Sequence, residues 1–296
     1  MNTRKKKRGG AKGLAMLAIL LLISLGVMLI WRIRLWGQGE KWALDFTPST
    51  SNAASDEPSS DATETIAAFA QEHNLTFDAT ETIAAFAQEH NLTLSDWPDS
   101  LLELLEKNPE AADFVLNYPL KKDLCPEIDL HEYTDCSEVP LFLQWDERWG
   151  YTVYGDNIMG LSGCGPTCLS MVCVYLLNDP QYSPRYIADF AQENGYCVPG
   201  NGSSWTLISE GGVMLGLDVI EIPLDEDRII RNLEVGNPVV CIMGPGDFTS
   251  TGHFIVMTGY EDGKIKVNDP NSPDRSNMLW DYDAIKDQIR NLWVCR

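Results

Sequence analysis

The chain has 296 residues, a formal net charge of -21 and an apolar content of 44%. Residues 1–41 carry nine Lys or Arg and a single acid, so nearly all of the 43 Asp and Glu belong to the rest of the chain. A body this acidic repels phosphate backbones, which argues against nucleic acid as a partner.

Residues 13–31 form an apolar run without a charge. As a helix this run would span about 28 Å, close to the hydrocarbon thickness of a bilayer. Because six basic residues precede it, the positive-inside rule places the N-terminus in the cytoplasm and the remainder outside the cell. We therefore expect residues 1–34 to be a basic tail and a single membrane anchor. A cleaved signal peptide is the alternative, although the sequence WRIR at 31–34 is a poor cleavage site.

Two regions of different composition follow the anchor. Residues 35–60, rich in Thr, Ser, Pro and Asp, predict a disordered linker. Residues 61–94 contain a repeat, because DATETIAAFAQEHNLT occurs at 61–76 and again, unchanged, at 78–93. Each copy predicts a helix with Ile, Phe and Ala on one face. Two copies are too few for a solenoid, so we expect a duplicated helical spacer.

Residues 95–138 predict a helical segment and a polar connector. Short helices are expected at 101–106 and 110–116, the second ending before the Tyr-Pro pair at 118–119.

The eight cysteines all lie beyond the apolar run. Cys125 and Cys136 are close in sequence and could close a loop through a disulfide in an oxidising exterior. Cys168 and Cys173 read as small buried apolar side chains on a helix.

Residues 139–296 predict one α+β domain. Helices are expected at 165–177, 184–192 and 205–215, and strands at 217–222, 238–243, 253–260 and 264–268. Helices come first and an antiparallel sheet follows.

Cys164 lies between two glycines, directly ahead of the helix that Pro166 begins. The glycines predict a sharp turn of the backbone, and the partial positive charge of a helix N-terminus lowers the pKa of a thiol. These features favour a nucleophile over a buried structural cysteine.

His253 is the only histidine in residues 139–296, because His73 and His90 belong to the repeat and His131 to the connector. It opens an apolar strand after a Gly-rich loop, where an imidazole could act as the base for the thiol. A hydrogen-bonded histidine at a strand end is the alternative.

Strand register predicts an orienting carboxylate. A three-residue turn at 261–263 would pair Ile255 with Asp269 and place Asp269 diagonally across from His253 on the same face. A two-residue turn would move Asp269 to the opposite face. Asn268 is the alternative orienting group, and a simple Asp-Pro turn is the structural alternative.

Four segments together resemble the papain-like cysteine peptidases, and more closely the C39-like branch similar to bacteriocin-leader-processing peptidases. They are QWDERW at 144–149, SGCGPT at 162–167, GHFIV at 252–256 and NDP at 268–270. The resemblance implies a papain-like fold, a helical part plus an antiparallel sheet, over residues 139–296. It implies these roles: Cys164 as nucleophile, His253 as base, Asp269 as orienter and Gln144 as an oxyanion-hole donor. For Gln144, a polar residue at a domain edge is the alternative.

We thus expect an extracellular thiol hydrolase that cleaves amide bonds in a peptide or in cell-wall material. No cofactor or metal is expected, because Cys-x-x-Cys spacing is missing and the stretch 269–274 reads as a surface turn rather than a calcium site. No P-loop accompanies the domain, and the predicted topology places it outside, so cleavage of exported leaders is not implied. Two other classes stay open: an inactive papain-like binding or scaffold module, and an acyl or peptidyl transferase.

Overall fold

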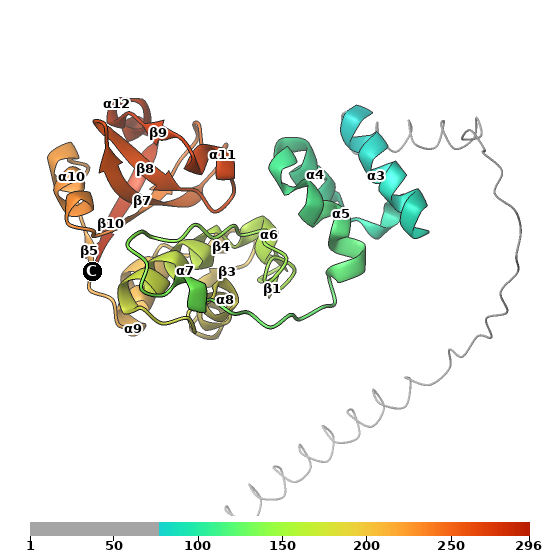
Figure 1. Cartoon of the computed structure of the whole chain (residues 1–296), viewed down its shortest axis with the longest axis horizontal. Coiled ribbons are helices and arrows are strands. Elements are labelled where there is room, and N and C mark those ends of the chain that lie inside the picture. Colours follow the sequence, from blue (N-terminus) through green and yellow to red (C-terminus); the bar gives the residue numbers. More distant parts are fainter. Residues whose placement is uncertain (1–76) are drawn as a thin grey trace, which may run out of the picture. The chain divides into compact units, whose positions relative to one another are not determined.

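The computed structural model describes residues 77–296, with side chains from residue 79 onward (Figure 1). The predicted tail and anchor (1–34), the predicted linker (35–60) and the first repeat copy (61–76) lie outside the described residues. Within residues 77–296, no helix is both long and apolar enough to cross a bilayer.

A helical segment opens the described part of the chain. Its elements are α3 (Phe77–His90), η1 (Leu94–Asp96), α4 (Asp99–Lys107), η2 (Pro109–Ala111) and α5 (Ala112–Lys121). The second repeat copy forms α3, and its Ile83 and Ala87 are buried in one cluster with Leu101 of α4 and Phe114 of α5. The predicted apolar face of the repeat is therefore confirmed for this copy, and it packs against its neighbours rather than acting as a bare spacer.

The expected end of α5 before Pro119 was wrong, because the helix continues to Lys121. A proline inside a helix lacks the N–H that would bond the carbonyl four residues earlier. That carbonyl belongs to Val115, and the indole Nε1–H of Trp97 donates to it at 2.7 Å. The tryptophan thus satisfies the acceptor that Pro119 leaves open.

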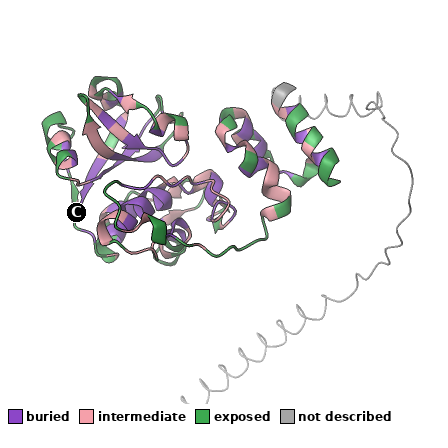
Figure 2. Ribbon diagram, viewed as in Figure 1, coloured by how far each residue is buried: buried purple, intermediate pink, exposed green. Residues whose placement is uncertain are grey.

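A second group of short elements follows the connector. It contains η3 (His131–Tyr133), β1 (Val153–Tyr154), β2 (Asn157–Ile158), α6 (Met159–Ser162), α7 (Cys164–Leu177), α8 (Pro184–Glu193), β3 (Cys197–Val198), β4 (Gly202–Ser203), η4 (Leu207–Gly211) and α9 (Gly212–Met214). Helix α7 is the centre of this half, and every residue from Gly165 to Val174 is buried (Figure 2). Cys168 and Cys173 are fully buried on it, as predicted. Cys125 and Cys136, in contrast, are exposed and free, so the disulfide that their spacing would allow is not formed.

The C-terminal half is a six-stranded antiparallel sheet with the order β5-β10-β6-β7-β8-β9. Its strands are β5 (Val219–Glu221), β6 (Val239–Met243), β7 (His253–Glu261), β8 (Lys264–Asn268), β9 (Leu279–Trp280) and β10 (Ile289–Cys295). The helices α10 (Glu226–Glu234), α11 (Pro273–Ser276), α12 (Tyr282–Ile285) and η5 (Lys286–Gln288) connect them. The last strand of the chain is inserted between β5 and β6, and the sequence patterns had not indicated it.

Both faces of the sheet are covered, which explains why β6 is buried at every position. Ile242 and Phe254 point into the cluster that contains α7, whereas Cys241 and Ile255 point into the cluster that contains α10. Each fully buried aliphatic side chain contributes about 1.5–3 kcal/mol relative to exposure, so the two clusters fix the register of the strands.

The hairpin between β7 and β8 differs from the expected one. Its turn has two residues, Asp262 and Gly263, with φ of 51° and 77°, instead of three. These positive angles are those of the hairpin turn that Asp-Gly favours. A β-bulge between Met257 and Gly259 then adds one residue to β7, so that Met257 faces Val267 as predicted. The bulge restores the register that the shorter turn would have shifted.

Candidate active site

Cys164 is the first residue of α7, one position inside the helix rather than ahead of it. Neither flanking glycine serves the predicted sharp turn. Gly163 has an ordinary φ of -88°, and a Cβ there would lie 2.6 Å from the carbonyl oxygen of Met159. A Cβ at Gly165 would lie 2.6 Å from Ser203 Oγ. Close packing of α6 and β4 around the helix tip therefore requires both glycines.

The structure brings Cys164, His253 and Asp269 together. His253 is the first residue of β7, and its Nε2 forms a 2.7 Å hydrogen bond with Asp269 Oδ1. The imidazole is 7% exposed and the carboxylate 0%. Because Nε2 is engaged by Asp269, the other ring nitrogen, Nδ1, is available to the Cys164 sulfur.

The electrostatics of the three groups favour a charged pair. Burial would raise the pKa of Cys164, but His253 and the backbone N–H groups of Phe254 and Gly165 outweigh it and lower that pKa. Burial would lower the pKa of His253, but Asp269 and the Cys164 sulfur raise it to about 10. Each of these shifts favours the charged form of its group, a thiolate at Cys164 and an imidazolium at His253.

Asp269 is held by more than the histidine. Its Oδ1 also accepts the N–H of Asn271 at 2.8 Å, and its Oδ2 accepts Nε–H of Arg275 at 2.6 Å. Burial would raise the pKa of Asp269, but His253 and Arg275 lower it below its usual value, so the carboxylate stays ionised. Arg275 was missed from the sequence, because an arginine on a short surface helix carries no signal of this contact.

Asn268, the alternative orienting group, is buried on the other side of β8. Its amide Nδ2 donates to the carbonyls of Val139 and Pro140, both at 3.0 Å. The Asn268 side chain therefore joins the start of the domain to the sheet, and its amide bonds these carbonyls rather than His253.

Gln144 is buried and lies beside the Asp269 loop, because its backbone N–H donates to the carbonyl of Pro270 at 2.7 Å. Its side-chain Nε2 donates to the carbonyl of Gly160 at 2.8 Å, and its Oε1 has no partner among the described residues. The residues that line the cleft at Cys164 do not include Gln144. The nitrogen expected to bind an oxyanion is thus engaged elsewhere in this conformation.

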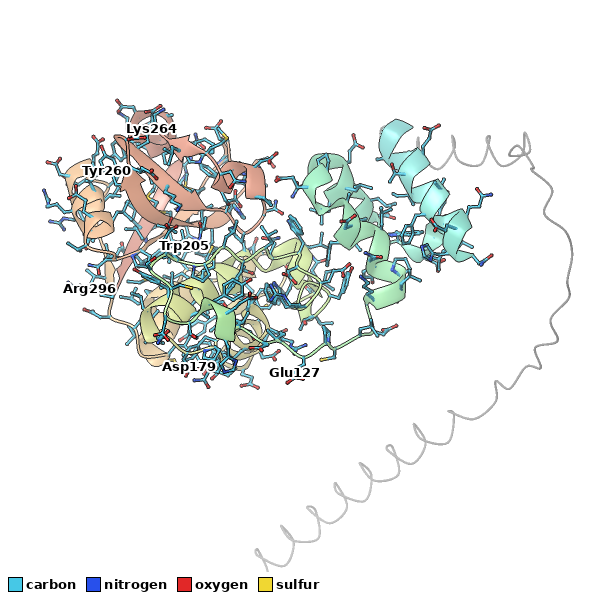
Figure 3. The ribbon with its side chains drawn as sticks, viewed as in Figure 1. Glu127, Asp179, Trp205, Tyr260, Lys264 and Arg296 are labelled. Atoms are coloured by element: carbon cyan, nitrogen blue, oxygen red, sulfur yellow. The ribbon has the colours of Figure 1, made fainter. Side chains whose placement is uncertain are left out.

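A cleft of about 900 Å³ opens at the thiol. Cys164 and His253 line it, and its walls come from both halves of the domain, including Trp205 from one side and Met243 from the other. Trp205, which Figure 3 labels, is 46% exposed at the wall of this cleft. The lining is mostly apolar side chains and glycines, which suits an extended peptide backbone.

Among residues 77–296, no group of three or more His, Cys, Asp or Glu side chains could hold a metal ion. The stretch 269–274, read from the sequence as a surface turn, contains the buried carboxylate of Asp269 instead.

Residues 136–295 match the Peptidase_C39 like family. Since the match spans more than half of the chain, the protein belongs to this family and is a cysteine-type peptidase.

Two solved structures are similar to part of the chain. One is the peptidase domain of Streptococcus ComA, a bifunctional ABC transporter involved in a quorum-sensing pathway; it is 17% identical, with a TM-score of 0.37, over 45% of this chain and 89% of its own. The other is described as a C39-like peptidase from Bacillus anthracis; it is 16% identical, with a TM-score of 0.35, over 58% of this chain and 98% of its own. None of the curated proteins compared with the chain matches it.

Proposed function

We propose that the protein hydrolyses amide bonds, in peptides or in the peptide part of cell-wall material, with Cys164 as nucleophile, His253 as acid and base, and Asp269 as orienting group. The observation that carries this proposal is the position of His253, which bonds Asp269 through one nitrogen and lies against the Cys164 sulfur. Asp269 keeps the imidazole in the orientation and tautomer that the reaction needs.

In the proposed reaction the Cys164 thiolate attacks the substrate carbonyl, and a carbon–sulfur bond forms. The imidazolium of His253 gives its proton to the amide nitrogen, the carbon–nitrogen bond breaks, and the amine leaves. Water then attacks the thioester while His253 accepts one of its protons. The carbon–sulfur bond breaks, the acid leaves, and the site again holds the Cys164 thiolate and the protonated His253.

The two rivals differ from this proposal in measurable ways. A binding module has no need of a thiol with a lowered pKa beside a buried imidazole–carboxylate pair, so the electrostatics favour an enzyme. A transferase would use the same acyl-enzyme but pass the acyl group to an amine. Products formed with and without an added amine acceptor distinguish the two enzymes.

The test uses the full-length protein and a peptide library. We expect Cys164→Ala to abolish cleavage and iodoacetamide to alkylate Cys164 before any other cysteine. The matched control is Cys125→Ala, because Cys125 is free and exposed but lies outside the cleft. Unchanged hydrolysis by the Cys164→Ala variant would exclude the proposal.

We also propose that the domain acts outside the cell, tethered by the apolar run at 13–31. The exposed thiol of Cys125 offers a test. A membrane-impermeant maleimide added to intact cells should label it, while a Thr3→Cys variant should stay unlabelled at its new cysteine. Labelling only after lysis would contradict the proposed topology.

A further inference from the structure

The loop that carries Asp269 is hydrogen-bonded to the helical segment that precedes the domain. Residues 269–276, here called the acid loop, run from the end of β8 through the four-residue helix α11. So short a helix cannot sustain itself, because helix nucleation is unfavourable without outside contacts. The position of Asp269 therefore depends on what holds the acid loop.

Inside the acid loop, two serines link Asp269 to α11. Ser272 is the N-cap of α11, and its Oγ accepts the N–H of Arg275 at 3.1 Å. Ser276 Oγ donates to the carbonyl of Ser272 at 2.7 Å and accepts the N–H of Asp269 at 2.9 Å. Because Arg275 also donates to Asp269 Oδ2, a displacement of Ser272 would move Arg275 and weaken its hydrogen bond to the carboxylate.

Two residues of the helical segment form hydrogen bonds with the acid loop. Glu110, in η2, accepts the hydroxyl of Ser272 at 2.5 Å with one oxygen and the N–H of Asp274 at 2.8 Å with the other. Asn108, just ahead of η2, donates from Nδ2 to the carbonyl of Asn271 at 2.7 Å. The backbone N–H of Asn271 in turn bonds Asp269 Oδ1. Asn108 thus contacts a residue that bonds the carboxylate, and Glu110 contacts Ser272, which bonds such a residue, Arg275.

The helical segment is firmly docked, so it can act as a support. The ring of Phe114 from α5 lies so close to Gly160 that an added Cβ there would be 2.4 Å from its Cζ. The same ring stacks on Tyr151, with centroids 4.5 Å apart. Lys121 pairs with Glu147 at 2.5 Å.

From these contacts we infer that Glu110 is a positioning residue of the peptidase site: the helical segment ahead of the domain holds the acid loop, and through it the Asp269–His253 pair, in its reactive geometry. This inference rests on the proposed roles of Cys164, His253 and Asp269. Glu110 does not line the cleft, so it acts without touching substrate.

The expected effect has a particular signature. Without Glu110, the acid loop loosens, Asp269 holds the imidazolium less well, and the pKa of the thiol rises. The rate at which iodoacetamide alkylates Cys164 rises with pH as the thiol ionises, and this rise is here called the acid limb. In Glu110→Ala the acid limb should move to higher pH by about half a unit. At a fixed pH below the thiol pKa, that shift corresponds to about threefold less thiolate. With a peptide substrate, kcat should fall by between about tenfold and a hundredfold at an unchanged KM, since misplacement of the catalytic groups affects the chemical step.

The experiment measures alkylation against pH in the full-length protein, with thermal unfolding as a check of folding. Glu110→Gln should recover most of the wild-type limb, because its amide can accept from Asp274 and donate to Ser272. Ser272→Ala should give a shift in the same direction, and the shift in the double variant should be smaller than the sum of the two single shifts, since both changes remove the hydrogen bond between Glu110 and Ser272. Glu103→Ala is the control: its ion pair with Lys107 is exposed on the same segment, and its limb should stay at the wild-type pH.

Two results would overturn the inference. One is a limb in Glu110→Ala that coincides with that of Glu103→Ala; the other is additive shifts in the double variant. If Glu110→Ala fails to fold, an unshifted limb in Ser272→Ala overturns it equally. A wild-type thiol that titrates at the ordinary cysteine value, about 8.5, would instead refute the proposed function, so the two failures are distinguishable.

Discussion

Asp269→Asn tests the electrostatic core of the proposed mechanism. The change keeps the size of the side chain and removes one negative charge, whose oxygen lies 2.7 Å from His253 Nε2. Two unit charges about 4 Å apart interact by about 4 kcal/mol at an effective dielectric constant of about 20. That energy corresponds to about three pH units in the pKa of the imidazole.

Arg275 offsets part of the carboxylate charge from the other side, so we expect about one to two pH units instead of the full effect. The sign follows from the wild type, in which Asp269 raises the pKa of His253. Its loss lowers that pKa, and the alkaline limb of kcat/KM moves to lower pH. The thiol loses its charged partner at the same time, so the acid limb moves to higher pH and the active window narrows from both sides.

The assay is peptide hydrolysis across the pH range, with iodoacetamide alkylation as a second readout that needs no substrate. We expect the maximum rate to fall by about 10²–10⁴, as for orienting carboxylates in related triads. Both limbs belong to the coupled pair rather than to either residue alone. An alkaline limb that stays within about 0.3 pH units of wild type, at unchanged stability, would refute the electrostatic account.

Two further variants test packing and the oxyanion site. Gly160→Ala should destabilise the fold by about 1–3 kcal/mol, because the new Cβ would meet the buried ring of Phe114. Thermal unfolding measures this loss, and the control is Gly252→Ala, because a Cβ at Gly252 would have no neighbour within 4 Å. Equal stability of the two variants would show that the helical segment is loosely docked. Gln144→Ala should cost about 1–3 kcal/mol of stability, because the carbonyl of Gly160 loses its donor. A loss of about 10²–10³ in kcat at unchanged stability would instead assign Gln144 to the oxyanion hole, with a conformation different from the one observed.

The juxtaposition of the three central residues could be predicted because each carries a local signal. A cysteine at a helix start, the one histidine of the domain at the start of a strand, and a carboxylate at the end of the next strand follow from short-range patterns. Most predicted strands agree with the structure for the same reason, since β6 and β7 are short apolar runs that neighbouring turns delimit.

The supporting contacts could not be predicted, because they join residues far apart in the sequence. Arg275 and Ser272 resemble ordinary residues of a surface turn until Asp269 and Glu110 are placed beside them. Strand β10 was missed because its sequence, IRNLWVC, mixes polar and apolar residues; the polar Asn291 lies next to the irregularity where its pairing with β6 shifts. Only the three-dimensional pairing shows that this strand lies inside the sheet, between β5 and β6.

The β7–β8 hairpin shows how the predicted juxtaposition arises by a different route. A two-residue turn alone would have placed Asp269 on the face opposite His253. The Asp262-Gly263 turn suits the twist of the strands, and the bulge before Gly259 then shifts β7 by one residue. Turn and bulge together equal the three-residue turn that was expected, so Val256 faces Asn268 and the next residue, Asp269, falls on the face of His253. The bulge is therefore a condition of the catalytic geometry: a change that removed it while keeping the turn would separate the carboxylate from the imidazole, even though neither residue had been altered.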